Sequence, residues 1–250
     1  MKMIIVAAGQ GTRLRPLTND KPKCMVKYNN KPIINYILET ASECNLEKIA
    51  IVNGYKKEVL ESYLQDKLLT FFTNKEFDKT NMVSTLFNAK EFMDDDIIIS
   101  YADIIYKKEI LEQLIVSEDE FSVVIDKEWK DLWSLRMENP LEDAETLKVL
   151  DGKIIELGKK PKSYDEIEGQ YIGLMKISKS AIKKVITYYE SLNKDKPYDE
   201  QDYNNMYMTS LIQMIIDNVM DVKPIWIEGG WIEIDCVEDM KMYNQKGIKF

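Results

Sequence analysis

A string near the beginning of the chain, A-A-G-Q-G-T-R-L-R-P-L-T-N-D-K-P-K, contains the residue types needed to hold a chain of phosphates. It starts at Ala7, inside an apolar run, and ends at Lys23. Gly9 and Gly11 allow the backbone to approach phosphate oxygens closely, and amides exposed by the turn can point at those oxygens. Arg13 and Lys23 would supply full positive charges. The string therefore predicts a loop that binds a triphosphate.

The spacing argues against two better-known phosphate loops. The dinucleotide fingerprint requires a third glycine where this chain has Leu14, and no acidic residue ends the second predicted strand to hold a ribose. No G-x-x-x-x-G-K-[ST] string is present, which argues against an ordinary P-loop kinase or GTPase. A bare G-x-G with basic neighbours is also typical of a solvated surface turn, so this alternative stays open on these residues alone.

Carboxylates at two later positions are candidates for binding a metal ion. Asp103 follows the apolar run 97–101, at the edge where α/β sheets bind ligands. In W-I-E-I-D, a period of two places Glu233 and Asp235 on the same side of a strand. Mg²⁺ prefers such oxygen ligands and neutralises a triphosphate. The alternatives are a turn that ends a strand for Asp103 and a solvent-facing strand side for the other two.

Composition limits the chemistry that the chain can perform. Histidine is absent from the 250 residues, which excludes Ser-His-Asp and Cys-His catalysis and metals held by histidine. Any catalysis must rely on Lys, Arg and carboxylates. The three cysteines are widely spaced and form no C-x-x-C pair, which favours a reducing cytoplasm. These cysteines are Cys24, Cys44 and Cys236.

The charge distribution favours a small anionic ligand. A net charge of -9 argues against a general nucleic-acid binder, because phosphate backbones are held by basic surfaces. Residues 10–31 reverse this trend, with Asp20 as their only acid. The basic residues in that range are Arg13, Arg15, Lys21, Lys23, Lys27 and Lys31. The apolar run 3–8 is far shorter than the roughly 20 residues of a membrane span, so no membrane partner and no signal peptide are expected.

The first half of the chain alternates predicted strands and helices. Strands are predicted at 2–7, 48–52, 68–73, 96–101 and 121–125, and helices at 32–43, 56–65, 81–93 and 107–116. This alternation indicates a doubly wound α/β sheet. We therefore expect residues 1–125 to form the nucleotide-binding half of a single domain that spans residues 1–250.

The pattern changes after residue 125. Asp151-Gly152, between alternating apolar residues, predicts a hairpin over 146–157, so residues 126–205 are expected to form an inserted antiparallel lobe. This lobe would bind an acceptor or act as a lid. Helices are predicted at 178–192 and 206–219, strands at 222–227 and 231–235, and a short helix from Val237. Residues 206–250 would thus close the domain.

The loop string resembles the signature G-x-G-T-R-L-x-P-L-T-x-x-x-P-K of nucleotide-diphospho-sugar transferases and related cytidylyltransferases. The resemblance implies their Rossmann-like, doubly wound mixed sheet, with catalytic roles for Arg13 and Lys23 on the nucleotide phosphates. It also implies that Asp103 and Asp235, together with Glu233, bind Mg²⁺. Asn81 matches a helix start beside the pyrimidine in the cytidylyltransferase branch, although it would equally serve as an ordinary N-cap. The implied nucleotide-binding residues are Ala7, Ala8, Gly9, Gly11, Thr12, Arg13, Lys23, Gly54, Asn81 and Ser84.

Further strings extend the resemblance over nearly the whole chain. They are V-x-G-Y, N-M-V-S-T-L, S-Y-A-D-I-I-Y, N-P-L-E-D-A-E-T-L, Q-Y-I-G-L, M-Y-M-T-S and W-I-E-I-D. They resemble bacterial cytidylyltransferases that activate small phosphates, and most of all the branch that serves capsular polysaccharide phosphoramidate biosynthesis. The implied reaction transfers CMP from CTP to phosphoglutamine, giving CDP-glutamine and pyrophosphate. Phosphocholine, aminoethylphosphonate and sugar phosphates are alternative acceptors.

Two other functions of related folds are less favoured by the residues. A noncatalytic nucleotide-binding regulatory subunit could lose the charged groups, yet Arg13, Lys23, Asp103 and Asp235 are all present. A glycosyltransferase would need a D-x-D metal motif, and residues 101–103 read Tyr-Ala-Asp. The expected partners are CTP and a small phosphorylated acceptor, and either a monomer or a homodimer is compatible with the sequence.

Four residues of the middle region are candidates for the acceptor pocket. They are Trp129, Trp133, Glu168 and Tyr171. Glu168 could meet an ammonium group, and the aromatic side chains could form the walls around it. Alternatively, the tryptophans cover the core of the inserted lobe, and the two interpretations are about equally supported.

Overall fold

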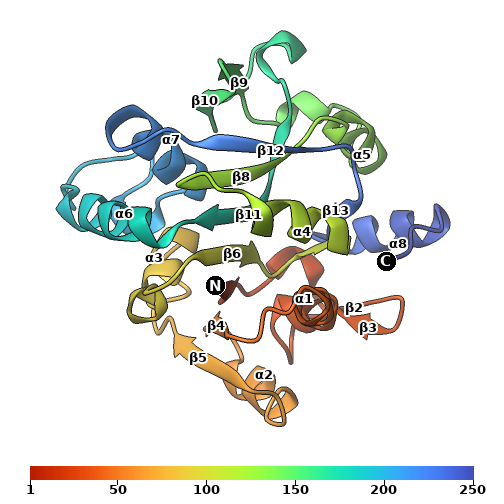
Figure 1. Cartoon of the computed structure of the whole chain (residues 1–250). Helices are drawn as coiled ribbons and strands as arrows, with labels where there is room; N and C mark the ends of the chain where they lie inside the picture. Colours follow the sequence, from red (N-terminus) through yellow and green to blue (C-terminus); the bar gives the residue numbers. More distant parts are fainter.

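A seven-stranded sheet forms the centre of the molecule (Figure 1). The computed structural model describes residues 1–250. The strands of this sheet are β1 (Lys2–Ala7), β4 (Ile49–Asn53), β5 (Leu69–Thr73), β6 (Ile97–Tyr101), β8 (Phe121–Asp126), β11 (Gln170–Ile177) and β12 (Lys223–Ile227). Their order is β12-β8-β11-β6-β1-β4-β5, and all run parallel except β11, which is antiparallel to β6 and β8. The doubly wound mixed sheet expected from the sequence is confirmed.

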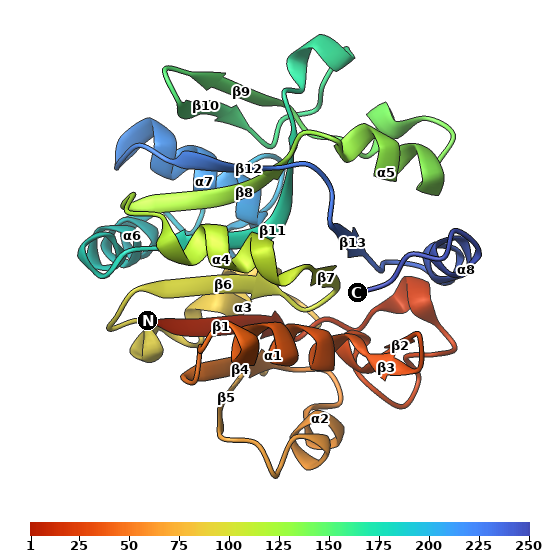
Figure 2. The same cartoon turned by 45° about the vertical axis from the view of Figure 1, so that its right-hand side comes forward.

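Helices cover both faces of the sheet because its central strands are apolar on both sides. In β1, Met3 and Ile5 belong to one buried cluster, and Ile4 and Val6 belong to the other. Helices α1 (Ile33–Glu43) and α4 (Lys108–Val116) pack in the first cluster, and α3 (Met82–Phe87), α6 (Lys179–Ser191) and α7 (Met208–Asn218) in the second. Figure 2 shows α1 and α4 in front of the sheet and α3 and α7 behind it.

Three small antiparallel pairs lie outside the main sheet. They are β2 (Lys27–Tyr28) with β3 (Lys31–Pro32), β7 (Ile104–Tyr106) with β13 (Trp231–Glu233), and β9 (Leu147–Leu150) with β10 (Lys153–Leu157). The β7–β13 pair brings the segment after β6 beside a segment near the end of the chain, with Glu233 opposite Ile104. The Ile234 amide also donates to the Asp103 carbonyl at 2.9 Å. This pairing positions the carboxylates discussed below.

The remaining helices are α2 (Lys57–Tyr63), α5 (Trp129–Arg136) and α8 (Val237–Gln245), with short 3₁₀ turns that include Thr12–Leu14, Lys23–Met25, Pro140–Glu142 and Tyr203–Asn205. No helix has both the length and the apolar character that a membrane span requires.

Most predicted elements are found within two residues of their expected bounds. The hairpin at Asp151-Gly152 is confirmed, because both residues have the positive φ, 51° and 70°, that its tight turn requires. The helix predicted at 81–93 is shorter, since α3 ends at Phe87 and a separate 3₁₀ turn, Lys90–Phe92, follows. The strand predicted at 231–235 ends at Glu233.

Besides the short strands β2, β3 and β7, the sequence pattern did not predict α5 and β11. Helix α5 was missed because only half of its eight residues are apolar. Strand β11 was missed because Gly173 and Lys176 interrupt its apolar run. The buried Lys176 is stabilised by hydrogen bonds from its ammonium group to the carbonyls of Ile115 and Ser117, at the negative end of α4. The range 126–205 therefore contributes a central strand to the main sheet besides the β9–β10 hairpin, which lies above the sheet in Figure 1.

Gly173 supplies a test of how β11 fits the sheet. A Cβ at this position would lie 2.4 Å from Tyr101 Cδ2, and the residue has a φ of +85°. We expect Gly173→Ala to lower the free energy of unfolding by about 2–4 kcal/mol, from overpacking and backbone strain together. Urea unfolding measures this loss. Gly247→Ala is the matched control, because Gly247 has a φ of +67° with no atom near its Cβ position. Equal losses in the two variants would contradict the steric explanation.

Candidate active site

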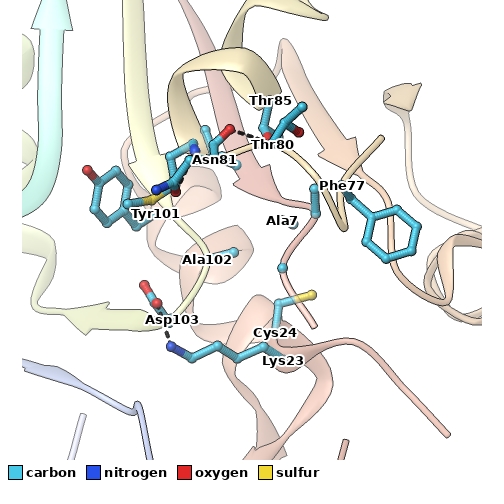
Figure 3. A pocket seen from close by; sticks show the side chains of 14 residues that line it. Ala7, Lys23, Cys24, Phe77, Thr80, Asn81, Thr85, Tyr101, Ala102 and Asp103 are labelled. Atoms are coloured by element: carbon cyan, nitrogen blue, oxygen red, sulfur yellow. Dashed lines mark hydrogen bonds and ion pairs between the residues drawn. The ribbon is translucent and has the colours of Figure 1, made fainter. Parts of the chain in front are cut away.

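A pocket opens at the carboxyl ends of β1 and β6 (Figure 3). We call it the loop pocket. Its lining residues are Val6, Ala7, Ala8, Gly9, Lys23, Cys24, Phe77, Thr80, Asn81, Met82, Thr85, Tyr101, Ala102 and Asp103. Figure 3 shows Thr80 and Asn81 at one end of the pocket and the Lys23–Asp103 pair at the other, with Ala102 between them. The pocket therefore has a polar, uncharged end and a charged end.

The glycine loop presents free backbone donors beside this pocket. The amides of Gly9, Gln10 and Gly11 donate no hydrogen bond to another protein group. The Gly11 carbonyl accepts hydrogen bonds from the Thr18 hydroxyl at 2.8 Å and from the Leu14 amide at 3.0 Å, which fixes the turn. Free amides on a fixed turn form a concave surface suited to anions.

Gly11 is required by the geometry of the loop. Its φ is +60°, and a Cβ there would lie 2.9 Å from Lys23 Cβ. The absence of a side chain at Gly11 thus lets the loop pass directly over the base of Lys23. This is the physical reason for the second glycine of the string.

Lys23 connects two carboxylates that are far apart in the sequence. Its ammonium nitrogen lies 2.7 Å from Asp103 Oδ2 and 2.8 Å from Asp235 Oδ1. Arg13 also contacts Asp235, with Nη2 2.5 Å from Oδ2. Burial alone would lower the pKa of Lys23, but Asp103 and Asp235 outweigh burial and raise it well above its ordinary value. Lys23 therefore stays charged in this environment.

Carboxylate oxygens of Asp103, Glu233 and Asp235 lie within 4.8 Å of one another. Burial, and then repulsion from Asp103, raises the pKa of Glu233, although Arg136 acts in the opposite direction. Asp103 Oδ1 is buried and has no hydrogen-bond partner. A close set of oxygen donors with one unsatisfied oxygen fits a hard divalent cation such as Mg²⁺.

Two residues that the sequence did not single out hold these carboxylates in place. Arg136 Nη1 lies 2.7 Å from Glu233 Oε2, and Arg136 Nε donates a hydrogen bond to Asp239 Oδ1 at 3.0 Å. Asp239 Oδ2 accepts hydrogen bonds from the amides of Asp235 and Cys236, both at 2.9 Å. Asp239 is part of a capping box at the start of α8, but the string C-V-E-D lacks the Ser or Thr and the Glu or Gln of the usual capping-box signal. Arg136 lies on the unpredicted helix α5 and also had no signal in the sequence.

A second cavity adjoins the loop pocket, since Met82 and Tyr101 line both. We call it the aromatic pocket. Its lining residues are Met82, Tyr101, Ile104, Trp133, Asp143, Glu145, Gln170, Tyr171, Ile172, Gly173, Tyr207, Met208, Thr209, Trp231 and Glu233. Asp103 lines the loop pocket and Glu233 lines the aromatic pocket, so the carboxylates lie where the two cavities meet.

Only two of the four acceptor candidates line the aromatic pocket. Trp133 and Tyr171 line the aromatic pocket. Trp129 does not, because it is buried behind Trp133, with ring centroids 6.0 Å apart, and packs in the core. Glu168 does not either, because its Oε1 accepts a hydrogen bond from the Val149 amide at 2.8 Å, on the hairpin side. Trp129 and Glu168, expected in an acceptor pocket, therefore do not line this cavity, and the glutamates that line it are Glu145 and Glu233.

The structure also places the residues expected to contact a nucleotide. Those that line the loop pocket are Ala7, Ala8, Gly9, Lys23 and Asn81. Gly11, Thr12 and Arg13 follow in the glycine loop and its 3₁₀ turn. Gly54 lies behind the pocket wall, where a Cβ would come within 2.7 Å of Phe77 Cβ. The Ser84 hydroxyl donates to the Asn204 carbonyl at 2.8 Å and does not line the pocket.

Asn81 is the N-cap of α3 and also lines the loop pocket. Its side chain accepts from the Met82 amide at 2.8 Å and so caps α3, and the same residue lines the loop pocket. Its Nδ2 donates only a long hydrogen bond, 3.4 Å, to the Asn205 carbonyl. A donor at this end of the pocket is therefore available to a ligand.

Proteins similar to this chain include two cytidylyltransferases and a CTP transferase. A relative 49% identical over 98% of this chain and 100% of its own length is "CTP:phosphoglutamine cytidylyltransferase" of Campylobacter jejuni subsp. jejuni serotype O:2. "Choline-phosphate cytidylyltransferase" of Streptococcus pneumoniae is 27% identical over 98% of this chain and 97% of its own. Among solved structures, the inositol-1-phosphate CTP transferase from T. maritima has a TM-score of 0.76 at 21% identity, covering 100% of this chain and 98% of the other, which supports the fold.

The family described as Nucleotidyl transferase matches residues 2–131, the part of the chain that includes the glycine loop, Lys23 and Asp103. Together with the full-length relative at 49% identity, this match shows that the chain belongs to the nucleotidyl transferase family.

Proposed function

We propose that this chain transfers CMP from CTP to a small phosphorylated amino compound, with phosphoglutamine as the acceptor and pyrophosphate as the leaving group. The observation that carries the proposal is the position of the carboxylates and Lys23 at the junction of two pockets. One pocket would hold the nucleotide and the other the acceptor, so that the reacting groups meet at the charged centre. The 49% identical phosphoglutamine cytidylyltransferase supports both choices of substrate.

The nucleotide would lie along the loop pocket. The free amides of residues 9–11 would bind the phosphates, and Arg13 and Lys23 would add positive charge beside them. The cytosine would lie at the opposite end, where Thr80 and Asn81 offer uncharged hydrogen-bonding groups. The Lys23 ammonium group has three N–H donors, of which the two carboxylates accept two, so the third would be free to donate to a phosphate oxygen.

Asp103 and Asp235, together with Glu233, would hold a magnesium ion. When bound, Mg²⁺ neutralises charge on the triphosphate. Arg136 keeps Glu233 oriented, and Asp239 fixes the backbone that carries Asp235. The protein thus supplies a prearranged set of charges at the place where charge changes during the reaction.

The chemical step would be an in-line displacement at the α-phosphorus. An oxygen of the acceptor's phosphate forms a bond to the α-phosphorus as the bond to the bridging oxygen of pyrophosphate breaks, and pyrophosphate leaves with that electron pair. The attacking phosphate is already an anion near neutral pH, so no general base is needed. This agrees with a chain that has no histidine. Positioning of the two substrates and the charges of Lys23 and Arg13 carry the catalysis.

Substrate choice is tested by measuring pyrophosphate release with Mg²⁺, each of the four nucleoside triphosphates and a panel of acceptors. The panel contains phosphoglutamine, phosphocholine, aminoethylphosphonate and glucose 1-phosphate. We expect turnover with CTP and phosphoglutamine, and rates at least about tenfold lower with the other triphosphates, since one missing hydrogen bond to the base costs about 1–3 kcal/mol. Turnover with UTP or dTTP but not with CTP would overturn the cytidylyl assignment. Turnover with CTP and a different acceptor would overturn only the assignment of phosphoglutamine as the acceptor.

A further inference from the structure

The aromatic pocket contains carboxylates but no basic side chain. Its ionisable acids are Asp143, Glu145 and Glu233, and neither lysine nor arginine lines it. Glu233 is already paired with Arg136 at 2.7 Å, and Asp143 is exposed. Glu145 is half-buried and makes no ion pair. It is therefore the carboxylate of this pocket that lacks a compensating charge.

The backbone of Glu145 is held firmly in place. The side chain of Gln170, the first residue of β11, accepts from the Glu145 amide at 2.9 Å and donates to the Glu145 carbonyl at 2.6 Å. The carboxylate itself receives one hydrogen bond, from the Thr209 hydroxyl to Oε1 at 3.3 Å. Oε2 has no hydrogen-bond partner in the protein. A rigidly mounted carboxylate thus presents a free oxygen at the pocket.

The surroundings of Glu145 disfavour its charge. Burial raises the pKa of Glu145 to about 7, with smaller contributions from Asp143 and Asp199, while the Thr209 hydrogen bond acts in the opposite direction. The nearby Tyr101 and Tyr171 hydroxyls are neutral near pH 7, since the ordinary pKa of tyrosine is 10.0 and burial raises it further. A cation placed in the pocket would relieve this cost.

The same pocket holds two unsatisfied neutral donors. Trp133 is 6% exposed, and its Nε1 is buried with no hydrogen-bond partner. The Tyr171 hydroxyl is buried and also lacks a partner. Buried polar atoms are rarely left unpaired, so two of them in the lining of one cavity indicate that the cavity receives a polar ligand.

We propose that Glu145 is the residue that selects acceptors carrying an ammonium group. An N–H of that group would donate to Oε2, the free carboxylate oxygen, and its charge would balance the otherwise uncompensated acid. The proposal rests on the proposed function in one respect, because it takes the aromatic pocket to be the acceptor's site. It assigns to Glu145 the role that the sequence pattern gave to Glu168.

Two matched ligands test this role. One is phosphoglutamine, and the other is its analogue with hydrogen in place of the α-ammonium group. We expect the wild-type protein to prefer phosphoglutamine by about 10- to 100-fold in kcat/KM and in the calorimetric Kd, the range expected for a hydrogen bond to a charged group. In Glu145→Gln the preference falls below about threefold. Glu168→Gln, whose carboxylate contacts only the Val149 amide, keeps the wild-type preference.

The pH profile separates recognition from a purely structural role. Between pH 6 and pH 8, the KM for phosphoglutamine should fall in the wild-type protein, because Glu145 must ionise to bind the ammonium group. The KM for the deaminated analogue serves as the control for ionisation of the acceptor phosphate, and subtracting its profile isolates the contribution of Glu145. In Glu145→Gln the two acceptors should show the same profile.

Calorimetry keeps this inference distinguishable from the proposed function, because binding is measured without turnover. An equal preference in wild type and Glu145→Gln overturns the role of Glu145, even if CTP and phosphoglutamine react. A lost preference in Glu145→Gln supports that role, even if the wild-type protein releases no pyrophosphate, and in that case the proposed reaction fails instead.

Discussion

Replacing Asp103 by Asn should reduce the rate of pyrophosphate release by at least about 10²- to 10³-fold, the loss that follows removal of one prearranged electrostatic contact at a reaction centre. Asp103 contributes one of the three clustered carboxylates and contacts Lys23 at 2.7 Å. The substitution removes a negative charge but keeps the shape of the side chain. Initial rates over a range of Mg²⁺ concentrations measure the effect, and we expect a higher requirement for Mg²⁺ as well as a lower maximal rate.

Metal removal and a matched variant complete this test. A chelator should abolish turnover by the wild-type protein, and added Mg²⁺ should restore it. Asp119→Asn is the control, because Asp119 is exposed and interacts locally with Ser117. A near-normal rate for Asp103→Asn, or full activity in the presence of the chelator, would contradict the proposed metal site.

Arg136→Met is expected to lower the free energy of unfolding by about 3–5 kcal/mol, the usual loss when one partner of a buried ion pair is removed. Arg136 has a side chain that is 5% exposed, and it contacts Glu233 and Asp239. Without it, the buried Asp239 and the half-buried Glu233 both lose their guanidinium partner. Urea unfolding at pH 7, extrapolated linearly to water, measures the change.

The pH dependence of this loss has a definite sign. Burial alone would raise the pKa of Asp239, but the hydrogen bond from Arg136 and the nearby amides lower it below its ordinary value of 3.8. The stabilisation from ionised Asp239 is therefore present above pH 3.8 and is lost as the pH falls below that value. The difference between Arg136→Met and wild type should shrink in that acidic range. Lys184→Met is the control, since its ion pair with Glu120 is exposed and contributes at most about 1 kcal/mol. A loss no larger than that of the control would refute this role of Arg136.

Local sequence patterns predict the parts of the fold that depend on local physics. The apolar run of β1, the Asp151-Gly152 turn and the glycine loop each require particular residue types at particular spacings, and the structure has them where expected. Strand β11 could not be predicted in this way, because Lys176 becomes compatible with the core only through carbonyls of a different element. Whether a lysine can be buried at position 176 depends on where α4 ends.

Local sequence patterns also predicted part of the candidate site. Lys23, Asp103 and Asp235 carry recognisable motifs, and the structure brings them into contact. Arg136 lies in no recognised motif, and Glu145 lies in the string N-P-L-E-D-A-E-T-L without any sign of its role. Their roles depend on contacts with residues 97 and 64 positions away. Only the folded chain shows which arginine and which glutamate have these neighbours.

The Lys23–Asp235 contact joins residues 212 positions apart, and this separation has a consequence for the order of events in folding. Contacts between distant parts of a chain close large loops and tend to form after local ones. The glycine turn can form early, whereas its charged centre remains incomplete until the segment around β13 docks beside β7. Activity therefore requires this docking, and a chain in which β13 has not docked beside β7 would lack its complete charged centre.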